Sequence, residues 1–184
     1  MTSAFTLPLA AFAGDLRLAA GTAEEVARAA KRAADAGEPV LVFDADGRPV
    51  DLDLRGTAEE VLARLPREAP RGPGRPKLGV TAREVTLLPR HWEWLARQPG
   101  GASVALRKLV EAASKSAREE TRRAQEVAYR FMSAMAGDRP GFEEATRALF
   151  AGDRARFETE TAAWPEDIRT HLETLAAGAF APAA

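Results

Sequence analysis

The chain contains no cysteine among its 184 residues and only two histidines, His91 and His171, which lie far apart in the sequence. The absence of cysteine excludes disulfide bonds, thiolate catalysis and zinc sites with cysteine ligands. Two distant histidines also argue against a histidine-rich metal site. We therefore expect a protein without a metal or another cofactor.

Long apolar runs are missing as well. The N-terminal stretch is apolar, but Pro8 interrupts it and it lacks the basic residues that open a signal peptide. No other stretch is long enough to cross a bilayer. Hydrophobic residues make up 46% of the chain and charged residues 29%, values typical of a folded globular protein. We expect a cytoplasmic protein of one ordinary domain or two small ones, with no membrane partner.

The charges are segregated along the chain, although 26 basic residues nearly cancel 27 acidic ones. Residues 67–130 carry 14 basic and 7 acidic groups, a net charge of +7, whereas 1–66 and 131–184 each have a net charge of -4. A basic block between acidic ones is typical of a segment that binds a polyanion. The alternative is that the basic block only pairs with its acidic flanks.

Two similar stretches, residues 15–26 and 51–61, each predict a strand followed by a helix. Both predicted helices begin with a capping box, in which a threonine hydroxyl accepts a backbone amide and a glutamate reaches back to the threonine: Thr22 with Glu25, and Thr57 with Glu60. The first helix is expected to end at Gly37.

An apolar run over residues 39–43, a turn at Asp46-Gly47 and an alternating stretch over 50–54 together predict a β-hairpin. Residues 1–66 are therefore interpreted as a small α+β domain. The alternative is a pair of duplicated hairpin–helix units packed together.

The rest of the chain is predicted to be mostly helical. Prolines and glycines make residues 67–79 a basic linker arm, because they favour neither a helix nor a central strand. Residues 80–136 predict a short strand at 83–88, a helix at 91–98 and a long helix from 103 to about 136, with a bend at 114–116. Residues 137–184 predict three short helices. The expected fold class is α+β.

Gly74-Arg75-Pro76, followed by Lys77, resembles the core of the AT-hook, which lies along the minor groove of A·T-rich DNA. Glycine has no Cβ to strike the groove floor, proline keeps the chain extended, and arginine enters the groove where negative potential is concentrated. The second flanking basic residue of the motif is replaced here by Pro73. The alternative is a proline-rich linker whose arginines are incidental.

The segment over residues 83–110 resembles the ribbon-helix-helix of bacterial repressors. Such domains pair their strands across a dimer and place the two-stranded ribbon in the major groove, while amides at the start of the second helix bind phosphate. The resemblance implies that Thr86 faces bases, that Ser103 lies at the phosphate-binding helix start and that Arg83 contacts the DNA backbone. The alternative is a strand–helix–helix element of a monomeric core.

The stretch from Val40 to Gly47 resembles the opening signature of haloacid dehalogenase-type phosphatases. This resemblance implies that Asp44 is the nucleophile and Asp46 the general acid and base. A predicted strand follows directly, however, so both aspartates also fit a solvated hairpin. A calcium-binding EF-hand loop is excluded, because Arg55 occupies the position that requires glutamate.

Several runs together resemble an uncharacterised bacterial family, domain of unknown function 2239, over nearly the full length. The runs are 74–79, 87–95, 98–110, 129–132 and 148–153. The resemblance implies no activity.

The sequence predicts a non-enzymatic DNA-binding protein, either a transcriptional regulator or a nucleoid-associated factor. It is expected to be a homodimer that binds DNA, with A·T-rich DNA favoured by the arm, and to take no small-molecule ligand. The candidate DNA-binding residues are Arg71, Gly74, Arg75, Pro76, Lys77, Arg83, Thr86, Ser103, Arg107 and Lys108. The alternative is a helical interaction or dimerisation protein that does not bind nucleic acid; a third possibility is a phosphatase built on Asp44 and Asp46.

Overall fold

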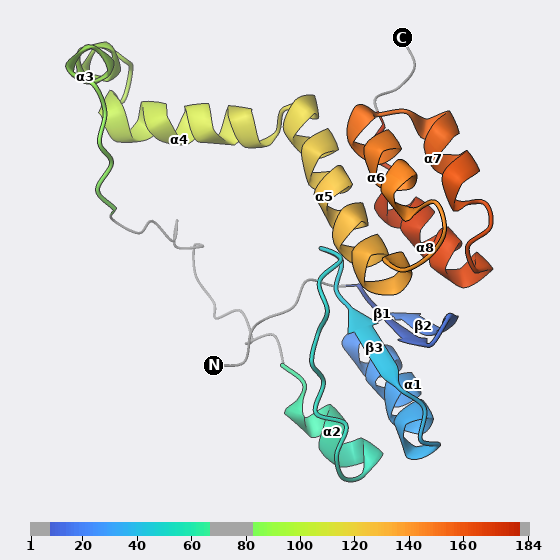
Figure 1. Ribbon diagram of the computed structural model, residues 1–184. Coiled ribbons are helices and arrows are strands. Elements are labelled where there is room, and N and C mark those ends of the chain that lie inside the picture. Colours follow the sequence, from blue (N-terminus) through green and yellow to red (C-terminus); the bar gives the residue numbers. More distant parts are fainter. Residues whose placement is uncertain (1–7, 67–82, 181–184) are drawn as a thin grey trace. The chain divides into compact units, whose positions relative to one another are not determined.

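The computed structural model describes residues 8–66 and 83–180 (Figure 1). The chain divides into two compact units: the first consists of Met1–Pro66 and Glu120–Ala184, and the second of Arg67–Glu119. The predicted arm over residues 67–79 lies outside the described residues. Within the described ranges, no helix is long and apolar enough to cross a membrane.

The first unit contains a three-stranded antiparallel sheet in the order β2-β1-β3. The strands are β1 (Leu9–Ala13), β2 (Leu16–Gly21) and β3 (Val40–Phe43). A register shift between Ala11 and Phe12 interrupts the pairing of β1 with β2. The central strand β1 is buried from Leu9 to Phe12, so both faces of the sheet are covered.

Alternation along β1 directs its side chains into two separate layers. Leu9 and Ala11 belong to a cluster with residues of helix α1 (Ala23–Asp35). Ala10 and Phe12 belong to a larger cluster with the C-terminal helices. Figure 1 shows α1 beside the sheet within this unit.

The larger cluster is built from α5 (Ala117–Ala136), α6 (Phe142–Ala151), α7 (Arg154–Thr161) and α8 (Glu166–Leu175). Its centre is aromatic. The ring of Phe131 lies 5.5 Å from that of Phe12 and 5.0 Å from that of Phe43. Segments that the sequence assigned to different regions, 1–66 and 137–184, therefore contribute to one core.

The predicted local signals of the first unit are mostly present, and the α+β fold class is confirmed. Both capping boxes form, at the starts of α1 and of α2 (Ala58–Arg64). Residues 50–54, predicted to form the second strand of a hairpin, are not a strand: pairing is limited to the bridge between Phe43 and Pro49 and to the Val50 amide, which donates to the Val42 carbonyl oxygen at 2.7 Å. The Asp53 carboxylate instead accepts the Arg55 amide at 3.2 Å, a local bond that competes with a strand ladder.

The second unit contains α3 (Pro89–Ala96) and α4 (Gly101–Ser114). Residues 83–88, predicted to be a strand, are not one in the structure, because no other described segment pairs with them. The predicted long helix is interrupted where a bend was expected. Lys115 caps α4, and the Ser116 hydroxyl accepts the Glu119 amide at 3.3 Å to begin α5.

Candidate nucleic-acid interface

Helix α3 has an apolar side and a basic side. Arg90, Trp94 and Arg97 follow one another at spacings of four and three residues, which places them on one face. Trp92 and Leu95 lie on the opposite face at a spacing of three. Leu95 is buried, whereas Trp94 is 51% exposed. The basic face therefore presents an accessible indole between two guanidinium groups.

Helix α4 is divided in the same way. At 100° per residue, its apolar residues from Ala102 to Ala113 fall within an arc of about 160°, with the exception of Val104, which lies on the remaining arc. Arg107, Lys108 and Lys115 fall on the remaining arc and are exposed. The cations of α4 therefore share their arc with Val104 and Glu111, while Leu106, Leu109 and Val110 lie on the apolar arc.

The basic side chains described in the second unit form no ion pair within the described part of the chain. Seven basic side chains occur in residues 83–119: Arg83, Arg90, Arg97, Arg107, Lys108, Lys115 and Arg118. None forms an ion pair with any residue that the structure describes. In the described part of the first unit, by contrast, twelve of fifteen basic side chains form one. Positive potential is therefore neutralised locally in the first unit and left available in the second.

The helix starts of the second unit also lack negative groups. Neither α3 nor α4 has a side-chain cap or an acidic residue in its first turn. Gly100, with φ of +86°, precedes α4, and the Gly101 amide donates to the Gln98 carbonyl oxygen at 3.0 Å. The next amides, of Ala102 and Ser103, have no protein acceptor among the described residues. Such a start favours an anion, because its free amides point outward and the helix dipole is positive there.

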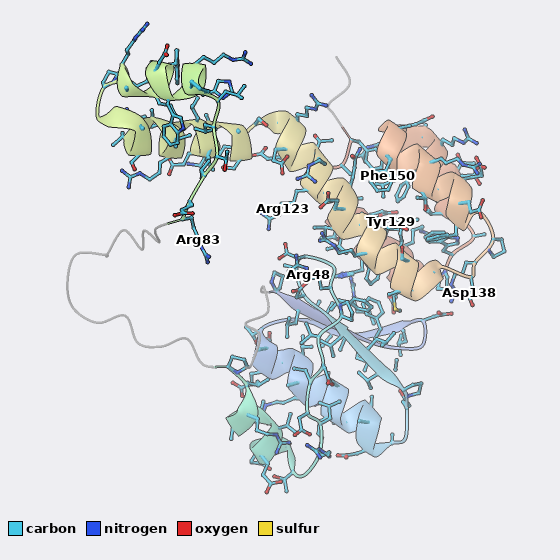
Figure 2. The ribbon with its side chains drawn as sticks, turned by 60° about the vertical axis from the view of Figure 1, so that its left-hand side comes forward. Arg48, Arg83, Arg123, Tyr129, Asp138 and Phe150 are labelled. Atoms are coloured by element: carbon cyan, nitrogen blue, oxygen red, sulfur yellow. The ribbon has the colours of Figure 1, made fainter. Side chains whose placement is uncertain are left out.

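Five of the ten predicted DNA-binding residues are described, and all five lie in the second unit. Arg83 and Thr86 are exposed in the extended segment before α3; Figure 2 labels Arg83. Ser103, Arg107 and Lys108 are exposed on α4.

The other five predicted residues lie outside the described residues: Arg71, Gly74, Arg75, Pro76 and Lys77. The sequence interpretation did not include Arg90 and Arg97, which flank Trp94 on α3. The sequence predicted a helix over 91–98, which excludes Arg90; a helix that begins at Pro89, as in the structure, would have placed the two arginines seven residues apart on one face.

Asp44 and Asp46, the residues of the phosphatase hypothesis, have structural contacts. Asp44 is buried, and its Oδ1 accepts the amides of Asp46 at 2.9 Å and Arg48 at 3.0 Å. Asp46 accepts a hydrogen bond from Arg123 at 2.8 Å; Figure 2 labels Arg48 and Arg123. A buried carboxylate that caps a turn is poorly placed to attack a substrate. Across the residues described, no three acidic or histidine side chains gather in a way that could hold a metal ion.

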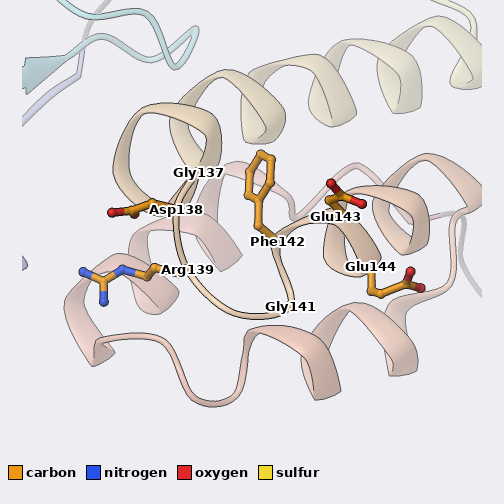
Figure 3. Close-up of a pocket in the computed structure, with 7 residues that line it drawn as sticks. All are labelled: Gly137, Asp138, Arg139, Gly141, Phe142, Glu143 and Glu144. Carbon is orange, nitrogen blue, oxygen red and sulfur yellow. The ribbon is translucent and has the colours of Figure 1, made fainter.

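A pocket of about 460 Å³ lies in the first unit, where α5 ends and α6 begins (Figure 3). It is lined by Gly137, Asp138, Arg139, Gly141, Phe142, Glu143 and Glu144. Arg139 is paired with Asp15, and Glu144 with Arg147 and Arg156. Acidic side chains thus outnumber the one cation, which makes the pocket unsuited to a phosphate group.

These features define an α+β protein with a compact mixed unit and a small basic helical unit. The chain belongs to the family described as "Uncharacterized protein conserved in bacteria (DUF2239)", whose model matches residues 8–176. This confirms the family predicted from the sequence. No curated protein and no solved structure matches the chain.

Proposed function

We propose that this chain is a non-enzymatic DNA-binding protein, a transcriptional regulator or nucleoid-associated factor, that contacts DNA through the second unit. The observation that carries the proposal is the set of seven basic side chains in residues 83–119 that form no ion pair with any other described residue. Folded proteins commonly pair such charges at their surface, as the first unit does. Unpaired cations on one unit are what a phosphate backbone neutralises when DNA binds.

The unit offers two kinds of phosphate contact. Arg107 and Lys108 on α4 supply charges on flexible side chains, and the uncapped first turn of α4 supplies fixed backbone donors in the amides of Ala102 and Ser103. Phosphate contacts position a protein on DNA but do not read its sequence. The preference for A·T-rich DNA is therefore assigned to the arm, through Arg75, and a further base contact to Thr86.

A fluorescence anisotropy titration with an A·T-rich duplex tests the proposal. If two copies together neutralise about eight phosphates, log affinity should fall with log salt at a slope of about -7. Arg107→Ala removes one contact per copy and should reduce the slope by about 2 units. Arg75→Ala should weaken binding and relax the A·T preference.

The matched control is Arg28→Gln, which removes an exposed arginine that is paired with Glu24 in the first unit. Its affinity and salt slope should equal those of the native chain. Absence of binding at low salt would refute the proposal. Equal effects of Arg28→Gln and Arg107→Ala would show that net charge alone governs binding.

A second candidate function is a helical interaction protein that does not bind nucleic acid. The exposed large apolar side chains of the second unit, including Trp92 and Val110, favour it. Purified protein free of nucleic acid, with no salt-dependent DNA binding but with self-association in sedimentation, would support this candidate over the first.

A further inference from the structure

Trp94 has the most exposed indole of the three tryptophans in the chain. It is 51% exposed, against 43% for Trp92 and 3% for Trp164. The buried Trp164 donates its indole N–H to the Pro140 carbonyl oxygen at 2.9 Å. The indole of Trp94, by contrast, makes no hydrogen bond, ring contact or cation contact with any described residue. Its ring faces and its N–H are therefore open to a ligand.

Two arginines bracket this indole on the same face of α3. At 100° per residue, Arg90 and Arg97 lie within about 60° of Trp94 around the helix axis, and they stand about 6 Å and about 4.5 Å from it along the axis, one on each side. Both are exposed. Neither pairs with Glu93, although Glu93 is three residues from Arg90 and four from Arg97. Positive charge is therefore available on both sides of an open aromatic ring.

The packing of α3 leaves this face uncovered by the rest of the described chain. Leu95 is the buried residue of the helix, so the side of Leu95 is the packed side. Around the helix axis, Leu95 lies about 140° from Arg90 and about 160° from Arg97. The two arginines thus project away from the packed side, with Trp94 beside them.

From these observations we infer that Trp94 stacks on an unpaired base of a DNA strand, while Arg90 and Arg97 contact phosphates on either side of that base. The inference rests on the proposed DNA binding and names the form of DNA that this face selects. Bases inside a duplex stack on one another, so an indole on a helix surface reaches only a base that is unpaired or displaced. None of the residues that the ribbon-helix-helix resemblance places on DNA lies on this face.

The alternation of charge and ring favours a single strand as the occupant. Arg90 and Arg97 stand about 10 Å apart along the helix, with the indole between them. The ligand that fits must therefore carry negative groups on either side of a flat ring. A single strand alternates phosphates and bases in this way, and proteins that bind it combine cations along its backbone with aromatic side chains under its bases.

Indole fluorescence of the full chain tests the stacking directly, because stacking on a base quenches the emission of an indole. An oligothymidine of about 12 nucleotides should lower the emission of the native chain at low salt. Trp94→Phe should abolish this fall. Trp92→Phe is the matched control, because Trp92 is exposed on the opposite face of the same helix, and it should keep the fall. Trp164 is buried and should contribute a constant background.

Fluorescence anisotropy measures what the stacking contributes to affinity. Trp94→Ala should raise the Kd for the oligothymidine by about 10- to 100-fold and change the Kd for a duplex by less than about 2-fold. Trp92→Ala should change neither Kd by more than about 2-fold. Arg90→Gln combined with Arg97→Gln should reduce the salt slope of single-strand binding by about 1.4, because two phosphate contacts are lost.

An oligothymidine with abasic sites removes the bases without changing the protein, so it separates stacking from folding. The native chain should bind this strand about as weakly as Trp94→Ala binds the intact one. Trp94→Ala should lose little more on the abasic strand, because the same contact is already missing.

The outcomes distinguish this inference from the proposed function. Equal losses in Trp94→Ala and Trp92→Ala, or an equal loss of Trp94→Ala on both forms of DNA, would overturn the inference and leave DNA binding intact. A native chain that binds the duplex but not the oligothymidine would overturn it as well. Binding to neither form of DNA at low salt would refute the proposed function itself.

Discussion

A β-carbon on Gly47 would lie 2.3 Å from the carbonyl oxygen of Val127. Gly47 sits in the turn that follows β3, and Val127 is on α5, so the turn and the helix meet backbone to backbone. Two side chains hold this contact: Arg123 donates to the Asp46 carboxylate, and Arg130 donates to the Asp46 carbonyl oxygen at 3.1 Å. The contact joins the N-terminal sheet to the C-terminal helices.

Replacing Gly47 with alanine should destabilise the first unit strongly. Gly47 has φ of +68°, which disfavours a side chain, and its close neighbour is backbone that cannot move aside. We expect a loss of about 3 kcal/mol in the free energy of unfolding and a fall of about 10 °C in melting temperature. Thermal and urea unfolding, followed by circular dichroism, measure both.

Gly14→Ala separates the cost of a positive φ angle from the cost of the close approach to the Val127 backbone. Gly14 has φ of +54° but nothing within 4 Å of its would-be β-carbon. This variant should lose only the backbone preference, roughly 1 kcal/mol. Equal losses at both positions would mean that the contact with Val127 relaxes without cost.

Asp44→Ala should lower stability by about 2 kcal/mol, because two partly buried amides lose their acceptor. Asp51→Ala, at a nearby exposed aspartate without such contacts, should stay within about 0.5 kcal/mol of the native chain. Urea unfolding measures both. In a generic phosphatase assay with magnesium, we expect background turnover from the native chain. Turnover that Asp44→Ala abolishes would revive the phosphatase hypothesis.

The stability of the first unit should fall as the pH falls from about 6.5 to 4. Burial, with a smaller contribution from the charge of Arg17, lowers the pKa of His171 from its ordinary 6.5 to about 4. The ring packs 4.7 Å from Phe131 and 5.5 Å from Phe12. In this pH window the unfolded chain binds a proton that the folded chain does not, so acid favours unfolding. The histidine should contribute a loss of about 3 kcal/mol by pH 4.

His171→Phe should remove that part of the pH dependence, since phenylalanine fits the aromatic surroundings and does not titrate. His91→Phe is the control, because His91 is exposed on α3. Urea unfolding at several pH values compares the two. If His171→Phe kept the full slope between pH 6.5 and 4, other groups would be responsible.

Features set by neighbouring residues could be predicted from the sequence. Each capping box needs only a threonine and a glutamate three residues later, and both formed. Gly37, with φ of +81°, follows α1 as expected. The break at Lys115 and Ser116 also fell where the pattern predicted a bend.

Features that depend on partners far apart in the sequence could not be predicted from it. The contact of Phe43 with Phe131 joins residues far apart in sequence, and a periodic pattern reveals that each is buried but not what it packs against. Residues 83–88 have the pattern of a strand, yet a strand also needs a partner, which the pattern does not supply. Composition indicated a basic region, but only coordinates revealed that Arg123 contacts Asp46 while Arg107 forms no ion pair with a described residue.

The contribution of α4 to DNA binding can be tested by reversing its charge. Arg107→Glu with Lys108→Glu replaces two exposed cations with carboxylates, so DNA affinity should fall by more than about 100-fold at low salt. Fluorescence anisotropy with the A·T-rich duplex measures the affinity, and Arg28→Gln in the first unit is the control. An unchanged affinity of the double variant would remove α4 from the proposed DNA interface, because two phosphate contacts per copy would then have been lost without effect.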